Sequence, residues 1–196
     1  MSKFLSLLSL IILLVGCDSS KKESATQNDF SNIKIDSTRI SNEQLIVDNY
    51  LKINSPKDWS VLNSPVELKK FSIGNVTRRD ENLIIMTKFI LSGKSQNQLM
   101  TISEILPDTN SASNFIDDYY KFLRLKFRND EISFSKFELS KKNIDMVQTK
   151  KQNLISLKFL ISSVNKKIYQ IEFTFLNTEY ENLIQDIKSS VASMKF

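Results

Sequence analysis

Residues 154–175 read LISLKFLISSVNKKIYQIEFTF, and this stretch decides the fold. Apolar side chains recur at every second position on both sides of a short polar break. They are Ile155, Leu157, Phe159 and Ile161 before it, and Tyr169, Ile171, Phe173 and Phe175 after it. This alternation is typical of half-buried β-strands. Asn165-Lys166 lies between the two runs, and asparagine tolerates the positive φ of a tight turn, so the pattern predicts an antiparallel hairpin.

Further extended segments are expected on the N-terminal side of this hairpin. Residues 131–139 are expected to pair with residues 144–150 across a turn at 140–143. The continuous apolar run at 83–91 fits a strand covered on both faces. Other short strands are predicted at 50–53, 59–62, 71–73 and 99–106. Residues 41–47 are expected to form a short helix.

Two longer helices are predicted from apolar stripes at helical spacing. The first is capped by Asn110 or Ser111, and its stripe is Ile116, Tyr119, Tyr120, Leu123 and Phe127. Thr178 and Glu181 have the spacing of a capping box at the start of the second. The apolar face of that helix is Tyr180, Leu183, Ile184, Ile187 and Val191.

The order of these elements resembles a known superfamily. A short strand enters Pro56-Lys57-Asp58-Trp59, a later strand reads YQIEFTF (169–175), and the last helix closes in SSVASMKF (189–196). This order resembles the PsbP-like superfamily, which also includes a Ran-binding nuclear-import factor and DcrB-type bacterial envelope lipoproteins. The resemblance covers residues 48–196 and implies an α+β fold, an antiparallel β-sheet with helices packed on its faces. It carries no catalytic motif, and its members have different roles, so it implies no single function.

The first seventeen residues are typical of an export signal that ends in a lipid-attachment cysteine. Lys3 precedes an apolar run at residues 4–15, which is shorter than the roughly 20 residues that a spanning helix needs. Leu14-Val15-Gly16-Cys17 resembles the bacterial lipobox. The resemblance implies removal of residues 1–16, diacylglycerol on the Cys17 thiol and a further acyl chain, such as palmitate, on the new amine. Two or more acyl chains bind a membrane durably. The alternatives are an ordinary secretory signal with a chance cysteine, or an uncleaved N-terminal helix.

The segment after the cysteine is expected to be a tether. Residues 18–32 contain one large apolar side chain, Phe30, and such a segment does not repay its ordering entropy. We therefore expect a lipidated N-terminus and flexible tether at 17–47 and a single domain at 48–196. Asp18 directly after the cysteine resembles the signal that retains enterobacterial lipoproteins at the inner membrane, although other lineages read early acidic residues differently. The expected location is the cell envelope, on the periplasmic face of the inner membrane or on the outer membrane.

Composition removes most catalytic chemistries. The chain has no histidine and one cysteine, which excludes the common Ser-His-Asp and Cys-His mechanisms and histidine-ligated metal sites. Neither Gly74 nor Gly93 lies in a phosphate-cradling loop. The net charge of +5 comes from basic residues scattered among acids, which argues against nucleic-acid binding. We expect no catalytic residue, no metal and no cofactor.

A few residues still have two interpretations. The adjacent carboxylates are Asp80-Glu81, Asp117-Asp118 and Asp130-Glu131. Such pairs can do acid–base work, but solvated turns and a helix N-terminus explain them as well. The aromatic residues that either belong to the core or line a ligand groove are Phe115, Tyr119, Tyr120, Phe122 and Phe127. Trp59 is expected to be a packing anchor.

These observations favour a membrane-anchored, non-catalytic module that binds an envelope protein or scaffolds an assembly. One alternative is an immunity or inhibitor lipoprotein that neutralises a toxin. Another is a small cell-envelope hydrolase, which would rely on exposed carboxylates or a Ser-Lys pair.

Overall fold

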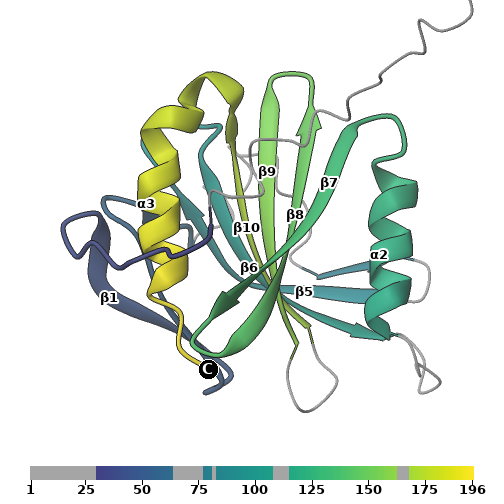
Figure 1. The fold of residues 1–196 in the computed structure, drawn as a ribbon, viewed down its shortest axis with the longest axis horizontal. Helices are drawn as coiled ribbons and strands as arrows, with labels where there is room; N and C mark the ends of the chain where they lie inside the picture. Colours follow the sequence, from purple (N-terminus) through teal and green to yellow (C-terminus); the bar gives the residue numbers. More distant parts are fainter. Residues whose placement is uncertain (1–29, 64–76, 81–82, 108–114, 163–167) are drawn as a thin grey trace, which may run out of the picture.

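The computed structural model describes residues 30–63, 77–80, 83–107, 115–162 and 168–196, and Figure 1 shows their arrangement. In these ranges the main sheet has eight strands, all paired antiparallel, in the order β3-β5-β6-β10-β9-β8-β7 with β4 beside β5. Its strands are β3 (Ser60–Val61), β4 (Thr77–Asp80), β5 (Leu83–Ser92), β6 (Leu99–Pro107), β7 (Glu131–Leu139), β8 (Lys142–Lys151), β9 (Leu154–Ser162) and β10 (Ile168–Leu176). A separate hairpin joins β1 (Ile40–Val47) to β2 (Leu51–Pro56). The helices are α2 (Phe115–Lys126) and α3 (Tyr180–Ala192), with the 3₁₀ turn η2 (Asn177–Glu179) before α3. The predicted fold class, an α+β antiparallel sheet with helices on its faces, is confirmed.

The predicted hairpin of β9 and β10 forms the middle of the sheet. Its register places Phe159 opposite Ile171 and Leu157 opposite Phe173, so the alternating apolar residues of both strands share one face. On the far side of β10, Ile171 lies opposite Ile102 of β6. The strand β10 therefore joins the two halves of the sheet.

The hairpin of β7 and β8 has a tighter turn than the sequence predicted. Ser140 and Lys141 have φ values of 51° and 65°, and Lys142 already pairs with Leu139. A two-residue turn with both φ values positive matches the right-handed twist of the strands, which is why such turns connect hairpins. The expected turn at 140–143 was therefore too long by two residues.

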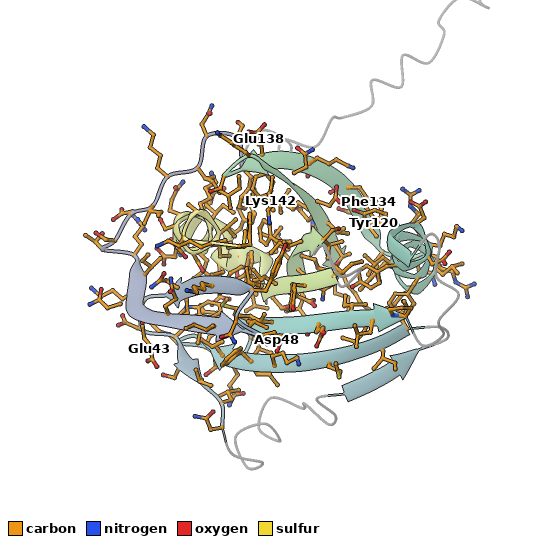
Figure 2. The ribbon with its side chains drawn as sticks, turned by 90° about the horizontal axis from the view of Figure 1, so that it is seen from below. Glu43, Asp48, Tyr120, Phe134, Glu138 and Lys142 are labelled. Carbon is orange, nitrogen blue, oxygen red and sulfur yellow. The ribbon has the colours of Figure 1, made fainter. Side chains whose placement is uncertain are left out.

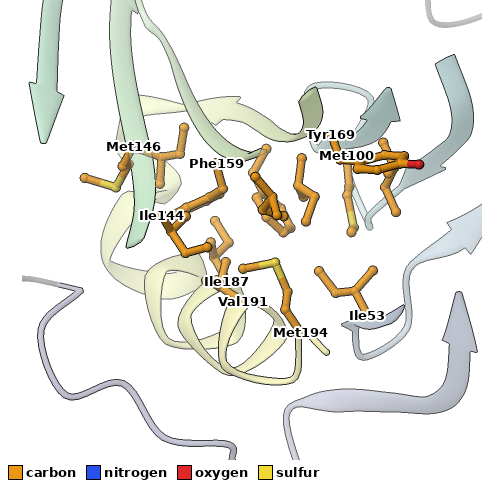
Figure 3. Packing of buried hydrophobic residues seen from close by; sticks show 14 of the residues in the cluster. Ile53, Met100, Ile144, Met146, Phe159, Tyr169, Ile187, Val191 and Met194 are labelled. Atoms are coloured by element: carbon orange, nitrogen blue, oxygen red, sulfur yellow. The ribbon is translucent and has the colours of Figure 1, made fainter. Parts of the chain in front are cut away.

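The helix α3 covers the apolar face of the sheet. Its predicted face is correct, since Leu183, Ile184, Ile187 and Val191 are buried. Figure 3 shows Ile187 and Val191 beside Phe159 and Ile144 of the sheet, with Met194 next to Ile53 of β2. After α3 the chain pairs with β2, because Lys52 and Lys195 exchange two backbone hydrogen bonds of 2.9 Å. The β1–β2 hairpin thus closes this side of the core.

The helix α2 covers the opposite face of the sheet, and in Figure 1 it lies on the other side of the molecule from α3. Its buried residues Tyr119, Phe122 and Leu123 belong to a second, smaller apolar cluster. The sheet contributes Ile105, Val147, Leu160 and Ile168 to this cluster, together with Leu83 and Ile85. Leu160 and Ile168 have the opposite alternation phase to Phe159 and Tyr169, so one pair of strands supplies both clusters.

The domain begins earlier than the predicted boundary at residue 48. Phe30, which the sequence placed in a tether, is 2% exposed, and its ring centroid lies 5.1 Å from that of Phe159 and 5.7 Å from that of Phe137. One aromatic side chain entering an aromatic cluster buries enough surface to hold the short segment that carries it. Phe30 therefore packs with the domain, which differs from the prediction that it lies in a tether at 18–32.

The predicted helix at 41–47 is wrong, because these residues lie in β1. Leu45 and Val47 are buried while Ile46 between them is 47% exposed, which is a strand's alternation. Their partners are on β2, where Leu45 lies opposite Ile53. Pairing with the next strand of the hairpin overrode the local helical preference of this segment.

The predicted capping box of Thr178 and Glu181 is also wrong. Thr178 belongs to η2, and α3 begins at Tyr180. Glu179 instead caps the turn η2, since its carboxylate accepts a 3.1 Å hydrogen bond from the Leu176 backbone N–H and a 2.8 Å bond from Gln98 Nε2. One carboxylate thereby serves both the helix start and the loop before β6.

Several predicted features lie outside the described residues. These are the export signal with Cys17, the strand at 71–73, the caps Asn110 and Ser111, and the turn at Asn165-Lys166. Within the described ranges, neither helix has the length and the apolar character needed to cross a membrane.

Candidate functional site

A polar pocket of about 230 Å³ lies between α2 and the sheet. Its walls come from α2 and from four adjacent strands, β5, β6, β10 and β9. The lining residues are Ile85, Thr87, Thr101, Ser103, Tyr119, Phe122, Leu123, Lys126, Phe127, Lys158, Gln170 and Glu172. The helix packs on apolar residues beside the pocket, and the polar side chains of the strands are left beneath its C-terminal half.

Strand alternation places these polar residues in the pocket. Lys158 falls between the core residues Leu157 and Phe159, and Glu172 falls between Ile171 and Phe173, so both point away from the main core. The register of β9 and β10 sets Lys158 directly opposite Glu172. Oppositely charged side chains at such cross-strand positions attract one another.

The two charges form a buried ion pair within a network of hydrogen bonds. Lys158 Nζ contacts Glu172 Oε1, and the Lys158 side chain is 4% exposed against 24% for Glu172. Lys158 Nζ also donates to Ser156 Oγ at 2.7 Å, and Ser156 Oγ donates to Glu172 Oε1 at 2.6 Å. Gln170 Nε2 donates to Glu172 Oε2 at 3.1 Å. A buried ion pair is tolerated when such bonds satisfy its remaining donors and acceptors.

The network holds Glu172 in its ionised form. Burial alone would raise the pKa of this carboxyl, but the charge of Lys158 and the hydrogen bonds from Lys158 and Ser156 outweigh it, and the pKa is lowered. Glu172 is therefore a fixed negative charge at neutral pH. A proton donor would need the opposite shift.

The α2 side of the pocket combines aromatic rings with a second ammonium group. Lys126 Nζ lies 5.5 Å from the ring centroid of Phe122 and 5.7 Å from that of Phe127, while Lys158 Nζ lies 5.6 Å from the centroid of Phe127. Both distances to Phe127 fall within the range of cation–π attraction. The Tyr119 hydroxyl donates to Gln170 Oε1, which ties the helix to β10.

Three of the five aromatic residues considered for a groove line this pocket. Tyr119, Phe122 and Phe127 face it. Tyr119 and Phe122 are also core residues, so the core interpretation and the groove interpretation both apply to this stripe. Tyr120 instead packs edge-to-face against Phe134 of β7, with ring centroids 5.5 Å apart, as Figure 2 shows. The side chain of Phe115 lies outside the described residues.

Of the adjacent carboxylates, Asp117-Asp118 and Asp130-Glu131 do not line the pocket, and the side chains of Asp80-Glu81 lie outside the described residues. Asp117 and Asp118 are exposed on the first turn of α2, and Glu131 is exposed at the start of β7. No group of three or more metal-ligating side chains occurs among the residues that the structure describes. Trp59 is a packing residue, with its ring 6.1 Å from that of Phe173.

A second buried carboxylate lies on the α3 face of the sheet. Glu104, 2% exposed in its side chain, accepts from Lys88 Nζ at 2.9 Å, and Lys88 also lies 3.6 Å from Asp48. The Tyr169 hydroxyl donates to Asp48 at 3.3 Å, and burial together with the charges of Asp48 and Glu104 raises the pKa of Tyr169 to about 12. These contacts tie the β1–β2 turn to β5, β6 and β10 and lie outside the pocket.

Lys158 and Glu172 were not identified from the sequence. Their signal was present, because each is a charged residue at an inward position of a strand whose other residues are mostly apolar. From the sequence alone, a single charged residue at such a strand position is interpreted as facing solvent, on a sheet that is covered on one face only. The register that places the two opposite one another comes from the structure.

Comparisons with known proteins support the fold. The solution structure of cyanobacterial PsbP (CyanoP) from Synechocystis sp. PCC 6803 aligns with a TM-score of 0.51 at 5% sequence identity, covering 78% of this chain and 91% of that one. A crystal structure from Bacteroides thetaiotaomicron VPI-5482 aligns with a TM-score of 0.42 at 12% identity, covering 78% of this chain and 47% of that one. No protein-family model and no curated protein matches the sequence. The likeness to CyanoP shows a PsbP-like fold, and at such low identity it shows the fold alone.

Proposed function

We propose that this protein is a lipid-anchored module of the cell envelope that acts by binding an envelope protein or scaffolding an assembly, without catalysis. The observation that carries the proposal is the state of the charged groups in the pocket. Lys158 and Glu172 neutralise one another, and hydrogen bonds from Ser156 and Gln170 hold Glu172 as an anion. Such a site is preorganised to hold a ligand, whereas proton transfer needs a group poised to change its charge.

The anchoring part of the proposal rests on Leu14-Val15-Gly16-Cys17 and on Cys17 being the only cysteine of the chain. Because Phe30 is buried in the core of the domain, at most residues 18–29 separate the lipid from the domain. Twelve residues reach at most about 40 Å at ~3.3–3.6 Å each. The pocket of an anchored domain would thus stay close to the bilayer, where an envelope partner is also held.

The anchor is tested by mass spectrometry of the N-terminal peptide and by metabolic labelling with palmitate. We expect a lipid-modified Cys17 at the new N-terminus, and loss of label in Cys17→Ser. An unmodified cysteine in the mature protein would remove the anchor from the proposal.

The binding role is tested by a photo-crosslinking amino acid placed in living cells at Leu125. This residue is 62% exposed on α2, on the helix that forms one wall of the pocket. Ile46 on β1, 47% exposed, is the matched control on another part of the surface. We expect a defined envelope protein to be captured from Leu125 and not from Ile46. Equal capture from both positions, or none from either, contradicts a partner at the pocket.

A further inference from the structure

We propose that the pocket between α2 and the sheet binds an uncharged sugar ring, either as a free monosaccharide or as the end of a glycan chain. This ligand goes beyond the protein partner proposed above and does not depend on it. Three features of the pocket carry the inference: the arrangement of its polar side chains, the balance of its charges, and its size.

The floor of the pocket consists of two rows of polar side chains that run across neighbouring strands. The neighbouring row on the same face of the sheet is apolar, and its residues are Ile85, Ile105 and Ile168. All six residues of the polar rows line the pocket, so polar groups of four strands converge on one space. The rows are Thr87–Ser103–Gln170, across β5, β6 and β10, and Thr101–Glu172–Lys158, across β6, β10 and β9.

The side chains of this floor keep both donors and acceptors for a ligand. In the described structure, Lys158 Nζ uses two of its three donor hydrogens, on Ser156 and Glu172. Gln170 Nε2 uses one of its two, on Glu172. The Thr101 hydroxyl makes no hydrogen bond to another described side chain, so it is able to donate one bond and to accept others.

Hydroxyl groups match this mixture of donors and acceptors. A ligand that enters a polar site displaces water, and it loses affinity unless it replaces the hydrogen bonds of that water. A hydroxyl replaces them because, like water, it both donates and accepts, whereas a carboxylate only accepts and an ammonium group only donates. Several hydroxyls are needed to reach two rows of side chains, and a sugar carries one on most of its carbon atoms.

The charges of the pocket already interact with one another. Burial opposes the ionisation of Glu172, but the charge of Lys158, and to a lesser extent that of Lys126, lowers the pKa of this carboxyl. A charged ligand would disturb this arrangement, because an anion would lie beside Glu172 and a cation beside Lys158. An uncharged ligand leaves the ion pair and its hydrogen bonds intact.

The size of the pocket suits one sugar ring. At about 230 Å³ the pocket is smaller than the ~300–1,000 Å³ of sites for drug-sized ligands. A longer glycan would therefore enter with its terminal ring alone. Phe122 and Phe127 of α2 form an apolar wall, against which the C–H groups of the ring pack while its hydroxyls reach the polar floor.

The test measures sugar binding to the full chain by ligand-observed NMR titration, in a detergent without a sugar head group. The probes are D-glucose, D-galactose and N-acetyl-D-glucosamine as free sugars, and N,N′-diacetylchitobiose as a glycan end. We expect at least one probe to bind with a Kd on the order of 1 mM or tighter, and about tenfold more tightly than cyclohexanol, whose ring carries a single hydroxyl. Tighter binding of the disaccharide than of N-acetyl-D-glucosamine identifies a glycan end, and the reverse order identifies a free sugar.

Matched variants separate the pocket from the rest of the sheet. Thr101→Val removes a hydroxyl from the floor and should weaken binding about fivefold, the effect of roughly one hydrogen bond. Thr174→Val is the control, because Thr174 lies on the same face of β10 two residues after Glu172 but does not line the pocket. Both threonines are half-buried and neither hydroxyl bonds to another described side chain, so both variants should fold.

Three results would overturn the proposal. The first is that no sugar probe binds. The second is that cyclohexanol, D-glucuronate or D-glucosamine binds as tightly as the best neutral sugar. The third is that Thr101→Val weakens binding no more than Thr174→Val does. Crosslinking from Leu125 reports on a protein partner and needs no sugar, so the failure of one proposal is distinguishable from the failure of the other.

Discussion

The strands β9 and β10 present two unlike faces, one that packs in the main apolar core and one that carries charged residues into a polar pocket. Toward α3 they carry Phe159, Phe173 and Phe175, each 0% exposed. Toward α2 the same strands carry the charged pair of Lys158 and Glu172. One stretch of sequence therefore supplies both a close-packed core and a hydrogen-bonded polar site.

The face toward α2 also buries an apolar cluster, so only the charged pair of Lys158 and Glu172 sets it apart from the face toward α3. Buried ion pairs are often no better for stability than well-packed apolar side chains of similar volume. The α3 face already buries a contiguous cluster with residues from α3, from the β1–β2 hairpin and from the strands of the main sheet. We therefore expect that removing both charges of the pair together costs little stability.

The largest expected loss of stability comes from a substitution in the apolar core on the α3 face. Phe159 is fully buried and its ring contacts those of Phe30, Phe137 and Phe173. Phe159→Ala should lower the free energy of unfolding by about 3–5 kcal/mol, measured by urea denaturation. Leu154→Ala on the same strand, where the side chain is 39% exposed, should cost less than about 1 kcal/mol. Equal losses would show that this face is not the main core.

A smaller loss of unfolding free energy is expected when one charge of the pair of Lys158 and Glu172 is removed. Lys158→Met leaves the Glu172 carboxylate without its cation and should cost about 2–3 kcal/mol, below the value for a fully buried pair because Glu172 is 24% exposed. The double variant Lys158→Met/Glu172→Leu removes both charges and should return to within about 1 kcal/mol of the unmodified protein. If the double variant is as unstable as the single one, the ion pair contributes to stability and the contrast between the faces is weaker than stated.

Lowering the pH should reduce the free energy of unfolding by a smaller amount, because it protonates Glu172 of the same ion pair. The pKa of Glu172 is lowered from its usual 4.5, so the unfolded chain takes up this proton first as the pH falls. The stability contributed is fully present above about pH 4.5 and is lost as the pH drops through the lower pKa of the folded state. The free energy of unfolding should therefore fall more steeply below pH 4.5 in the unmodified protein than in Glu172→Gln.

Comparing the unmodified protein with Glu172→Gln separates the contribution of Glu172 to the pH dependence from that of other carboxyl groups. Hydrogen bonds from Thr38 also lower the pKa of the exposed Asp36, which titrates in the same pH window in both proteins. Parallel pH profiles for the two would mean that the folded state does not hold Glu172 as an anion.

The smallest loss of stability is expected from removing the hydrogen bond between the Thr87 and Ser103 hydroxyls in the pocket. Thr87→Val keeps the side-chain shape and removes the 3.1 Å bond to Ser103. The net value of such a bond is about 0.5–1.5 kcal/mol, and the half-exposed position of Thr87 places the expected loss at the lower end. Denaturation of Thr87→Val, Ser103→Ala and the double variant checks this. A double loss equal to the sum of the single losses would show that the two hydroxyls do not interact.

Local periodicity was enough to predict much of the fold. The alternating residues of β9 and β10 and the apolar stripe of α3 are short-range patterns, and each held in the structure. Two features that depend on a pairing or packing partner were missed. Residues 40–47 form β1 because β2 pairs with them, although only the second of these strands was predicted. Phe30 is buried because it packs in an aromatic cluster whose other members lie far away in the sequence.

The candidate site shows the same limit. The aromatic residues Tyr119, Phe122 and Phe127 could be singled out from their spacing on one helix. The pairing of Lys158 with Glu172 required the register between two strands, and the approach of Lys126 required the position of α2 over the sheet. A pocket built from several elements is a tertiary property, and single-sequence periodicity does not contain it.

The position of β10 also bears on how the chain is made. This strand is synthesised after all the others in the described sheet, yet it is the one that joins β6 to β9. A nascent chain that has reached Ser162 has two unconnected sheet fragments with exposed edges, and such edges are where newly made chains aggregate. The two parts of the sheet can therefore join only after residues 168–176 have been synthesised.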